Sequence, residues 1–197
     1  MSTKKEFDVI VWGASGFTGK LVCEYVFKKF RTNNELKWAM AGRDLSKLET
    51  VKAEIADHTI PIVIADSNDI KSLDLMTQRT KVVCTTVGPY AKYGSKLVQS
   101  CIENRTHYCD LAGEVQWIRK MIDKYHEKAK RNTVKIVNSC GFDSIPSDLG
   151  VYYIQKESKQ KLNKRAKNIN MRVAGIKGGI SGGTYASLSN VTKEAFK

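Results

Sequence analysis

Apolar and amphipathic segments alternate along the first 150 residues of the chain. An apolar run at residues 8–12 leads into an amphipathic stretch at 18–30, and the alternation then repeats. The apolar runs predict strands at 8–12, 37–41, 61–65, 81–86, 107–111 and 134–138, with helices between them. Short strands joined by helices require right-handed crossovers and a parallel sheet covered on both faces. We therefore expect a doubly wound α/β fold.

The pattern changes after residue 150. We expect a short helix there, followed by a basic stretch, a strand at 170–176, a glycine-rich turn and a helix from Thr184. No further strand follows that helix, so a second sheet is begun and not finished. The predicted organisation is a dinucleotide-binding domain at 1–150 and, at 151–197, a connecting segment and the start of an incomplete second α/β domain.

Composition places the chain among ordinary globular proteins, because 42% of its 197 residues are hydrophobic and 27% are charged. No apolar run approaches the roughly 18 residues of a membrane span. The polar N-terminus lacks the apolar stretch of a secretory signal, so we expect an intracellular protein. The five cysteines stand in no metal-ligand spacing, which indicates a reducing compartment and no metal site.

The net charge of +13 is concentrated near the C-terminus, where residues 156–197 carry ten basic and two acidic side chains. This basic tail could contact an anionic membrane surface, but a solvated surface loop is the favoured interpretation. No aromatic residue interleaves the basic run at 156–167, which argues against a nucleic-acid platform. The sequence leaves a homodimer open.

A glycine-rich loop connects the first predicted strand to the first predicted helix. Its glycines are spaced G-x-x-G-x-x-G, one residue longer than the standard dinucleotide motif. Glycines let a diphosphate approach the backbone, and the start of the helix offers free N–H groups and a positive dipole end. We therefore expect the diphosphate of a nicotinamide dinucleotide to bind Gly13, Ser15, Gly16, Phe17, Thr18 and Gly19.

Residues at the ends of the next strands add to this site. Arg43 follows the second strand, where an arginine pairs with the 2′-phosphate of NADP, so we predict NADP with NAD as the alternative. Asp44 next to it is expected to cap the following helix. Asp66 is placed either to reach the adenine or to form a turn, and Gly88 and Tyr90 follow the fourth strand at the ligand crevice.

The catalytic residues are less clear from the sequence. Tyr90, Asp143 and Ser144 follow strand ends and are candidate proton donors to a substrate at the nicotinamide. Asp143 and Ser144 are equally suited to cap the helix that Pro146 begins. Glu114 is expected to start the helix that runs to residue 130, where the helix dipole favours a carboxylate.

Two further motifs point to other chemistry. Ser139, Tyr152 and Lys156 have the spacing of a short-chain dehydrogenase triad, but here the serine closes the sixth strand and not the fifth. Ser181 lies in a G-x-S-x-G motif at 179–183, yet no histidine follows it to complete a hydrolase triad. We keep the short-chain dehydrogenase triad as a minor alternative and reject the hydrolase motif.

Several segments together resemble a known family. These are GASGFTG at 13–19, AGR at 41–43, VGPY at 87–90, YCDLAGE at 108–114, GFDSIPSDLG at 141–150 and GGISGGTYAS at 178–187. They are similar to the saccharopine dehydrogenase-like oxidoreductases. The resemblance implies an NADP-binding Rossmann domain followed by a second α/β domain that completes the active cleft, most of which is missing here.

The resemblance also implies a function. Its nearer branch contains lipid-associated proteins of lipid droplets, membranes or mitochondria and bacterial trans-acting enoyl reductases, with a link to glycolipid biosynthesis. We therefore expect an NAD(P)-dependent oxidoreductase that acts on an unidentified small-molecule or lipid substrate and depends on a C-terminal domain for activity. The competing hypothesis is a truncated nucleotide-binding module without catalysis.

Overall fold

A computed structural model describes residues 5–31, 35–175, 177–179 and 182–195. It contains a parallel sheet of six strands in the order β3-β2-β1-β4-β5-β6. The strands are β1 (Phe7–Trp12), β2 (Trp38–Gly42), β3 (Ile62–Ile64), β4 (Thr80–Thr85), β5 (His107–Cys109) and β6 (Ile136–Val137). The helices that connect them are α1 (Phe17–Phe30), α2 (Leu45–Ile55), α3 (Ile70–Gln78), α4 (Tyr90–Glu103) and α5 (Val115–Arg131). The predicted doubly wound Rossmann-type fold is confirmed.

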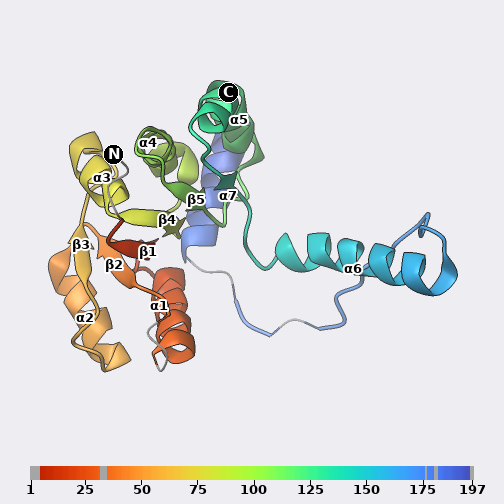
Figure 1. Ribbon diagram of the computed structural model, residues 1–197, viewed down its shortest axis with the longest axis horizontal. Coiled ribbons are helices and arrows are strands. Elements are labelled where there is room, and N and C mark those ends of the chain that lie inside the picture. Colours follow the sequence, from red (N-terminus) through yellow and green to blue (C-terminus); the bar gives the residue numbers. More distant parts are fainter. Residues whose placement is uncertain (1–4, 32–34, 176, 180–181, 196–197) are drawn as a thin grey trace.

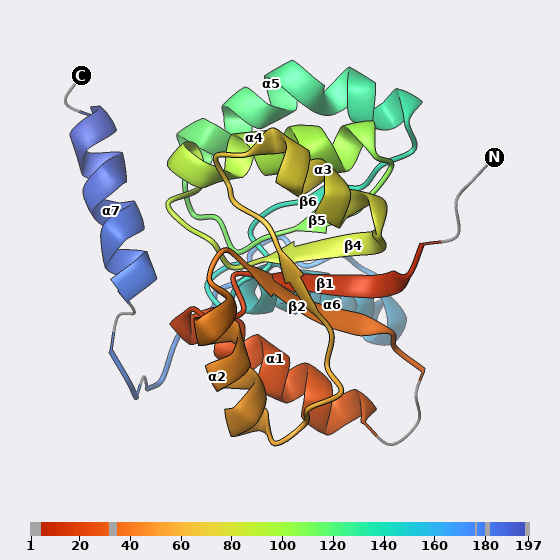
Figure 2. The ribbon, with the colours of Figure 1, turned by 90° about the vertical axis from the view of Figure 1, so that its left-hand side faces the viewer.

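Helices cover both faces of the sheet. Figure 2 shows α1 and α2 on one face and α3, α4 and α5 on the other. Between the sheet and α1 and α2 lies one buried cluster, which includes Met40 and Leu48. Between the sheet and the other three helices lies a larger cluster, which includes Ile10, Leu97 and Trp117. The central strand β1 contributes Ile10 to the larger cluster and Val11 to the smaller one, as expected for a parallel strand that is covered on both faces.

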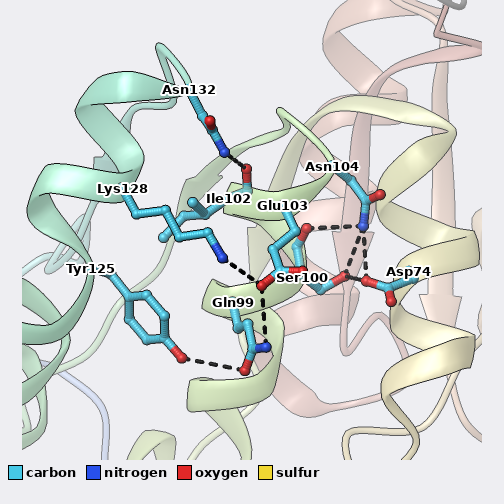
Figure 3. A network of polar contacts seen from close by, with 9 residues as sticks. All are labelled: Asp74, Gln99, Ser100, Ile102, Glu103, Asn104, Tyr125, Lys128 and Asn132. Atoms are coloured by element: carbon cyan, nitrogen blue, oxygen red, sulfur yellow. Dashed lines mark hydrogen bonds and ion pairs between the residues drawn. The ribbon is translucent and has the colours of Figure 1, made fainter.

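A polar network ties α3, α4 and α5 together above the larger core (Figure 3). The carboxylate of Asp74 on α3 accepts hydrogen bonds from Ser100 (2.6 Å) and Asn104 (2.8 Å) at the end of α4. Lys128 on α5 donates to Glu103 on α4 at 2.7 Å. The bonds to Asp74 satisfy buried polar groups such as the hydroxyl of Ser100, which is 1% exposed, whereas the Lys128–Glu103 pair lies nearer the surface.

The helix α6 (Ile145–Leu162) differs from the expected short helix after residue 150. It begins five residues before Gly150, because Ser144 takes the N-cap position and Pro146 suits the first turn. Figure 1 shows α6 extending away from the sheet. None of its side chains is buried, and Leu149 and Tyr152 are among its exposed apolar residues.

The strand expected at 170–176 is wrong for residues 170–175, which have no regular secondary structure, and Ile176 lies outside the described residues. A strand needs a neighbour for its backbone groups, and the sheet of the described residues ends at β6. The last helix is α7 (Gly182–Ala195), and it begins two residues before the expected start. The proposed division into two domains stays a prediction, and its boundary at residue 150 falls inside α6.

Two findings bear on the classes of function considered. No helix in the described part of the chain is both long and apolar enough to cross a membrane. The histidine, cysteine and acidic side chains of the same residues form no group of three that could hold a metal ion.

Candidate functional site

The glycine-rich loop lies where β1 ends beside β4, at the point where the strand order reverses. The Thr86 amide donates to the Trp12 carbonyl at 3.0 Å and links the ends of the two strands. Gly13 adopts a φ of +88°, and a Cβ built on it would lie 2.6 Å from Cγ2 of Val87. Only glycine fits this position, because a side chain would meet both an unfavourable backbone conformation and a neighbouring strand end.

The other two glycines of the loop have different tasks. Gly16 takes the N-cap position of α1, and a Cβ there would approach only the Gly13 carbonyl oxygen, at 3.3 Å. A Cβ on Gly19 would lie 2.0 Å from the same oxygen, so Gly19 lets α1 pack directly on the loop. The amides of residues 17–19 have no acceptor within the helix, and the first turn carries no acidic residue. They are therefore available to an anion.

A cavity of about 350 Å³ opens over this loop. We call it the Arg43 cavity. Arg43 makes no ion pair with any described residue, whereas Asp44 beside it caps α2 by accepting from the Lys47 amide at 3.2 Å, as predicted. The lining residues are Trp12, Gly13, Ser15, Gly16, Phe17, Thr18, Gly42, Arg43, Ser67, Thr86, Val87, Gly88, Tyr93 and Gly183.

Three of the expected cofactor-binding residues, Gly19, Asp66 and Tyr90, do not line this cavity, and Tyr90 lines the second cavity described below instead. Gly19 lies beneath the loop and acts through packing. The Asp66 carboxylate accepts a hydrogen bond from the Asn68 amide at 2.7 Å, which is the turn-forming role left open by the sequence. The neighbouring Ser67, which sequence reasoning missed, reaches the cavity instead. A direct role of Asp66 in cofactor binding stays a prediction.

A second cavity of about 610 Å³ continues from the first along the ends of β4, β5 and β6. We call it the Glu114 cavity. The two cavities share Thr18, Thr86, Gly88 and Gly183 and together form one cleft. The remaining lining residues are Tyr90, Leu111, Gly113, Glu114, Gly141, Phe142, Asp143, Thr184 and Ser187.

Tyr90 forms part of the wall of the Glu114 cavity. Only 5% of the residue is exposed, and its ring packs against Trp117 with 5.6 Å between ring centroids. Its hydroxyl donates to the Thr85 carbonyl at 3.4 Å and accepts from the Leu111 amide at 3.3 Å. Burial raises the pKa of Tyr90 well above its usual range. The geometry therefore favours a structural role over that of a proton donor.

Glu114 has an unexpected role. It begins α5 as predicted, since its carbonyl accepts from the Ile118 amide, but its side chain does not serve the dipole of α5. The carboxylate instead accepts from the amides of Tyr90 (2.7 Å) and Ala91 (2.9 Å) in the first turn of α4. The Ser187 hydroxyl on α7 donates to the same carboxylate at 3.0 Å. The expectation that the dipole of α5 holds this carboxylate is wrong.

Asp143 and Ser144 lie at the start of α6. The Asp143 side chain is exposed and lines the Glu114 cavity, whereas Ser144 does not reach it. Ser144 takes the N-cap position without a side-chain capping bond. Of the three candidate proton donors, Asp143 therefore has the most accessible acidic group in the cleft.

A buried carboxylate supports this end of the cleft. Asp110, which is 1% exposed, accepts hydrogen bonds from Tyr108 (2.7 Å), Asn138 (2.7 Å) and the Ser139 amide (2.9 Å). It thereby joins the segment after β5 to the segment after β6. The sequence indicated a motif at 108–114 but no role for Asp110, because Asn138 and Ser139, the partners that join the two segments, are distant in the chain.

The structure does not bring the residues of the short-chain dehydrogenase motif together. The Ser139 hydroxyl donates to the Ala112 carbonyl at 2.7 Å, and Tyr152 and Lys156 lie on α6, which extends away from the sheet (Figure 1). Tyr152 is 68% exposed. Ser181 lies outside the described residues.

Strand order, glycine loop and cleft together define a dinucleotide-binding Rossmann protein. The residues fit such a ligand, because the glycine positions leave open backbone at the start of α1 and Arg43 can pair with a phosphate.

Residues 9–137 match the family model of the saccharopine dehydrogenase NADP-binding domain. The chain belongs to this family, and its cofactor is of the NADP type.

Curated relatives extend the comparison. A trans-acting enoyl reductase of Mycobacterium tuberculosis is 40% identical over 157 residues, which cover 79% of this chain and 37% of that protein. A second M. tuberculosis protein, provisionally given the same name, is 40% identical over 196 residues, covering 98% of this chain and 46% of that protein. A lipid droplet localized protein of Caenorhabditis elegans is 38% identical over 188 residues, covering 92% of this chain and 44% of that protein. The chain thus spans less than half the length of these relatives.

Among solved structures, apo saccharopine dehydrogenase (L-Glu forming) from Saccharomyces cerevisiae superposes with a TM-score of 0.61 at 19% identity. The match covers 78% of this chain and 32% of the yeast enzyme. At this identity the likeness confirms the fold alone.

Proposed function

We propose that this chain forms the cofactor-binding part of an NADPH-dependent reductase that acts on an enoyl-type or imine-type carbon. The observation that carries the proposal is the continuous cleft. One end has the open amides of α1 and the unpaired Arg43, and the other end is a larger cavity beside Glu114 and Asp143. The relatives named trans-acting enoyl reductases favour an enoyl substrate over an imine.

Different residues of the cleft bind different parts of the cofactor. Residues 17–19 present amides to the diphosphate, and Arg43 presents a guanidinium to the 2′-phosphate. When bound, the cofactor supplies the hydride. The buried Tyr90 forms part of the cavity wall, and the exposed Asp143 carboxyl can orient a substrate or hold a proton at its Oδ atoms.

The proposal is tested by titrating the purified chain with NADPH and NADH while following nicotinamide fluorescence. We expect saturable binding of NADPH and weaker binding of NADH. If neither ligand binds, the proposal is refuted. Oxidation of NADPH by the chain in the presence of an α,β-unsaturated acyl thioester would then exclude the competing hypothesis, a nucleotide-binding module that binds NADPH without turnover.

We further propose that the protein associates with lipid. Two observations support this: the relative named a lipid droplet localized protein, and α6, whose exposed apolar residues precede the basic run at 156–167. Membrane or mitochondrial association and a role in glycolipid biosynthesis are finer possibilities within this proposal. Flotation with vesicles tests it: vesicles containing anionic lipid should retain the chain, and neutral vesicles should retain less. Equal absence from both would refute it.

A further inference from the structure

The outer wall of the Glu114 cavity is built by a helix from far along the chain. From α7, Gly183, Thr184 and Ser187 line this cavity, whereas only Gly183 reaches the Arg43 cavity. Ser187 also lies close to the loop after β4, since a Cβ on Gly88 would be 3.2 Å from its hydroxyl oxygen. The two halves of the cleft therefore depend on α7 to different degrees.

A hydrogen bond to the buried carboxylate of Glu114 holds α7 against the cleft. Glu114 is 2% exposed, and its carboxylate accepts hydrogen bonds from the Tyr90 and Ala91 amides in the first turn of α4 and from the Ser187 hydroxyl on α7. A buried carboxylate is costly unless donors surround it, and bonds to charged groups are stronger than bonds between neutral groups. Loss of Ser187 would remove the α7 donor and leave the bonds to α4 intact.

We propose that Glu114 and Ser187 are positioning residues that hold α7 as the outer wall of the Glu114 cavity and so set the affinity for the nicotinamide half of NADPH. The inference rests on the proposed placement of NADPH along the cleft. The adenosine half lies at Arg43 and the glycine loop, where α7 contributes one glycine. The nicotinamide half lies in the Glu114 cavity, where α7 contributes three residues.

The test compares two ligands on the full chain. NADPH spans both cavities, whereas adenosine 2′,5′-bisphosphate carries only the adenosine half and the 2′-phosphate. We expect Ser187→Ala to lower the affinity for NADPH roughly tenfold, as the loss of one hydrogen bond to a charged group predicts. The affinity for the bisphosphate should stay unchanged. Ser189→Ala, on the same helix and without a hydrogen bond to any described side chain, is the matched control and should change neither affinity.

A second variant addresses the other partner. Glu114→Gln places an amide NH₂ or a single carbonyl oxygen against three donors, so it should weaken NADPH at least as much as Ser187→Ala does. Because it also disturbs the start of α4, its unfolding midpoint is measured alongside. If it does not fold, Ser187→Ala alone decides the matter.

The outcomes separate the two proposals. If wild-type protein binds neither ligand, the placement of NADPH itself is wrong. The positioning role is overturned if wild-type protein binds both ligands and Ser187→Ala binds NADPH as tightly as wild type does. It is also overturned if Ser187→Ala lowers the affinities for both ligands equally. An equal effect of Ser189→Ala would overturn it too, because the loss would then not depend on the bond to Glu114.

Discussion

Replacing Gly19 by alanine tests the packing beneath the glycine loop. The added Cβ would lie 2.0 Å from the carbonyl oxygen of Gly13, 2.7 Å from its carbonyl carbon and 2.9 Å from Cα of Ala14. All three are backbone atoms, so no side chain can rotate away to make room. The start of α1 must therefore move away from the loop that connects it to β1.

The expected loss of stability follows from two opposing contributions. Alanine is favoured over glycine within a helix by up to about 1 kcal/mol. Overpacking typically costs about 1–3 kcal/mol, and a clash with backbone falls at the upper end. We expect a net loss of about 2 kcal/mol in the free energy of unfolding, which lowers the urea midpoint by roughly 1 M. NADPH affinity should fall too, because the amides of the first turn shift.

Gly16→Ala is the matched control, since it adds the same methyl group three residues earlier. Its Cβ would contact only the Gly13 oxygen, at 3.3 Å, and would project where a diphosphate has to approach. We expect nearly unchanged stability and a large loss of NADPH affinity. Urea denaturation and NADPH titration of both variants test the reasoning, which is refuted if Gly19→Ala unfolds at the wild-type midpoint or Gly16→Ala keeps wild-type affinity.

Three other predictions concern charged residues. In paired titrations, Arg43→Ala should lower the affinity for NADPH more than that for NADH, because the unpaired guanidinium is placed for the 2′-phosphate. Equal losses of the two affinities would refute the pairing of Arg43 with the 2′-phosphate. Asp74→Ala should lower the free energy of unfolding by about 1–3 kcal/mol in urea melts, because Ser100 and Asn104 lose their shared acceptor (Figure 3). The hydrogen bond from Lys81 holds the pKa of Asp8 below its ordinary value of 3.8. The ionised carboxylate therefore stabilises the folded state above that pH, and this stabilisation disappears as the carboxylate is protonated at lower pH. Asp8→Asn should therefore cost at most about 1 kcal/mol at neutral pH and nothing once the wild-type carboxylate is protonated, as melts across that range can show.

The fold and one end of the cleft were predictable because their signals are local. Each strand is an apolar run, and each connection is an amphipathic run, so order and type follow from neighbours in sequence. The same holds for the cap at Asp44, whose partner is three residues away. The glycine loop is contained within seven residues, and the restrictions at Gly13 and Gly19 arise largely from contacts with the loop and the adjacent end of β4.

The expectations that were wrong depended on what lies nearby in space. The apolar residues at 170–175 are compatible with a strand, but a strand forms only where another strand can pair with it. The sequence predicted a helix beginning at Pro146 and a short helix after residue 150, whereas the structure has one helix, α6, that continues through Gly150; an isolated glycine inside a helix costs only about 1 kcal/mol. Glu114 precedes a helix in sequence, and yet its carboxylate binds the start of a different helix.

The two ends of the cleft therefore differ in how the sequence encodes them. The Arg43 cavity is formed mainly by the glycine loop after β1, with Arg43 after β2 and residues 86–88 after β4, so its recognition of an NADP-type cofactor depends on a few short segments. The Glu114 cavity combines segments near Gly88, Leu111, Gly141 and Gly183, held together by the carboxylates of Asp110 and Glu114. A substitution near Leu111 or Gly141 can change the shape of the second cavity without touching the first, because these two segments line only the second cavity. Substrate preference can thus diverge among proteins with this glycine loop while cofactor preference stays the same, which is why the loop identifies the cofactor and leaves the substrate to experiment.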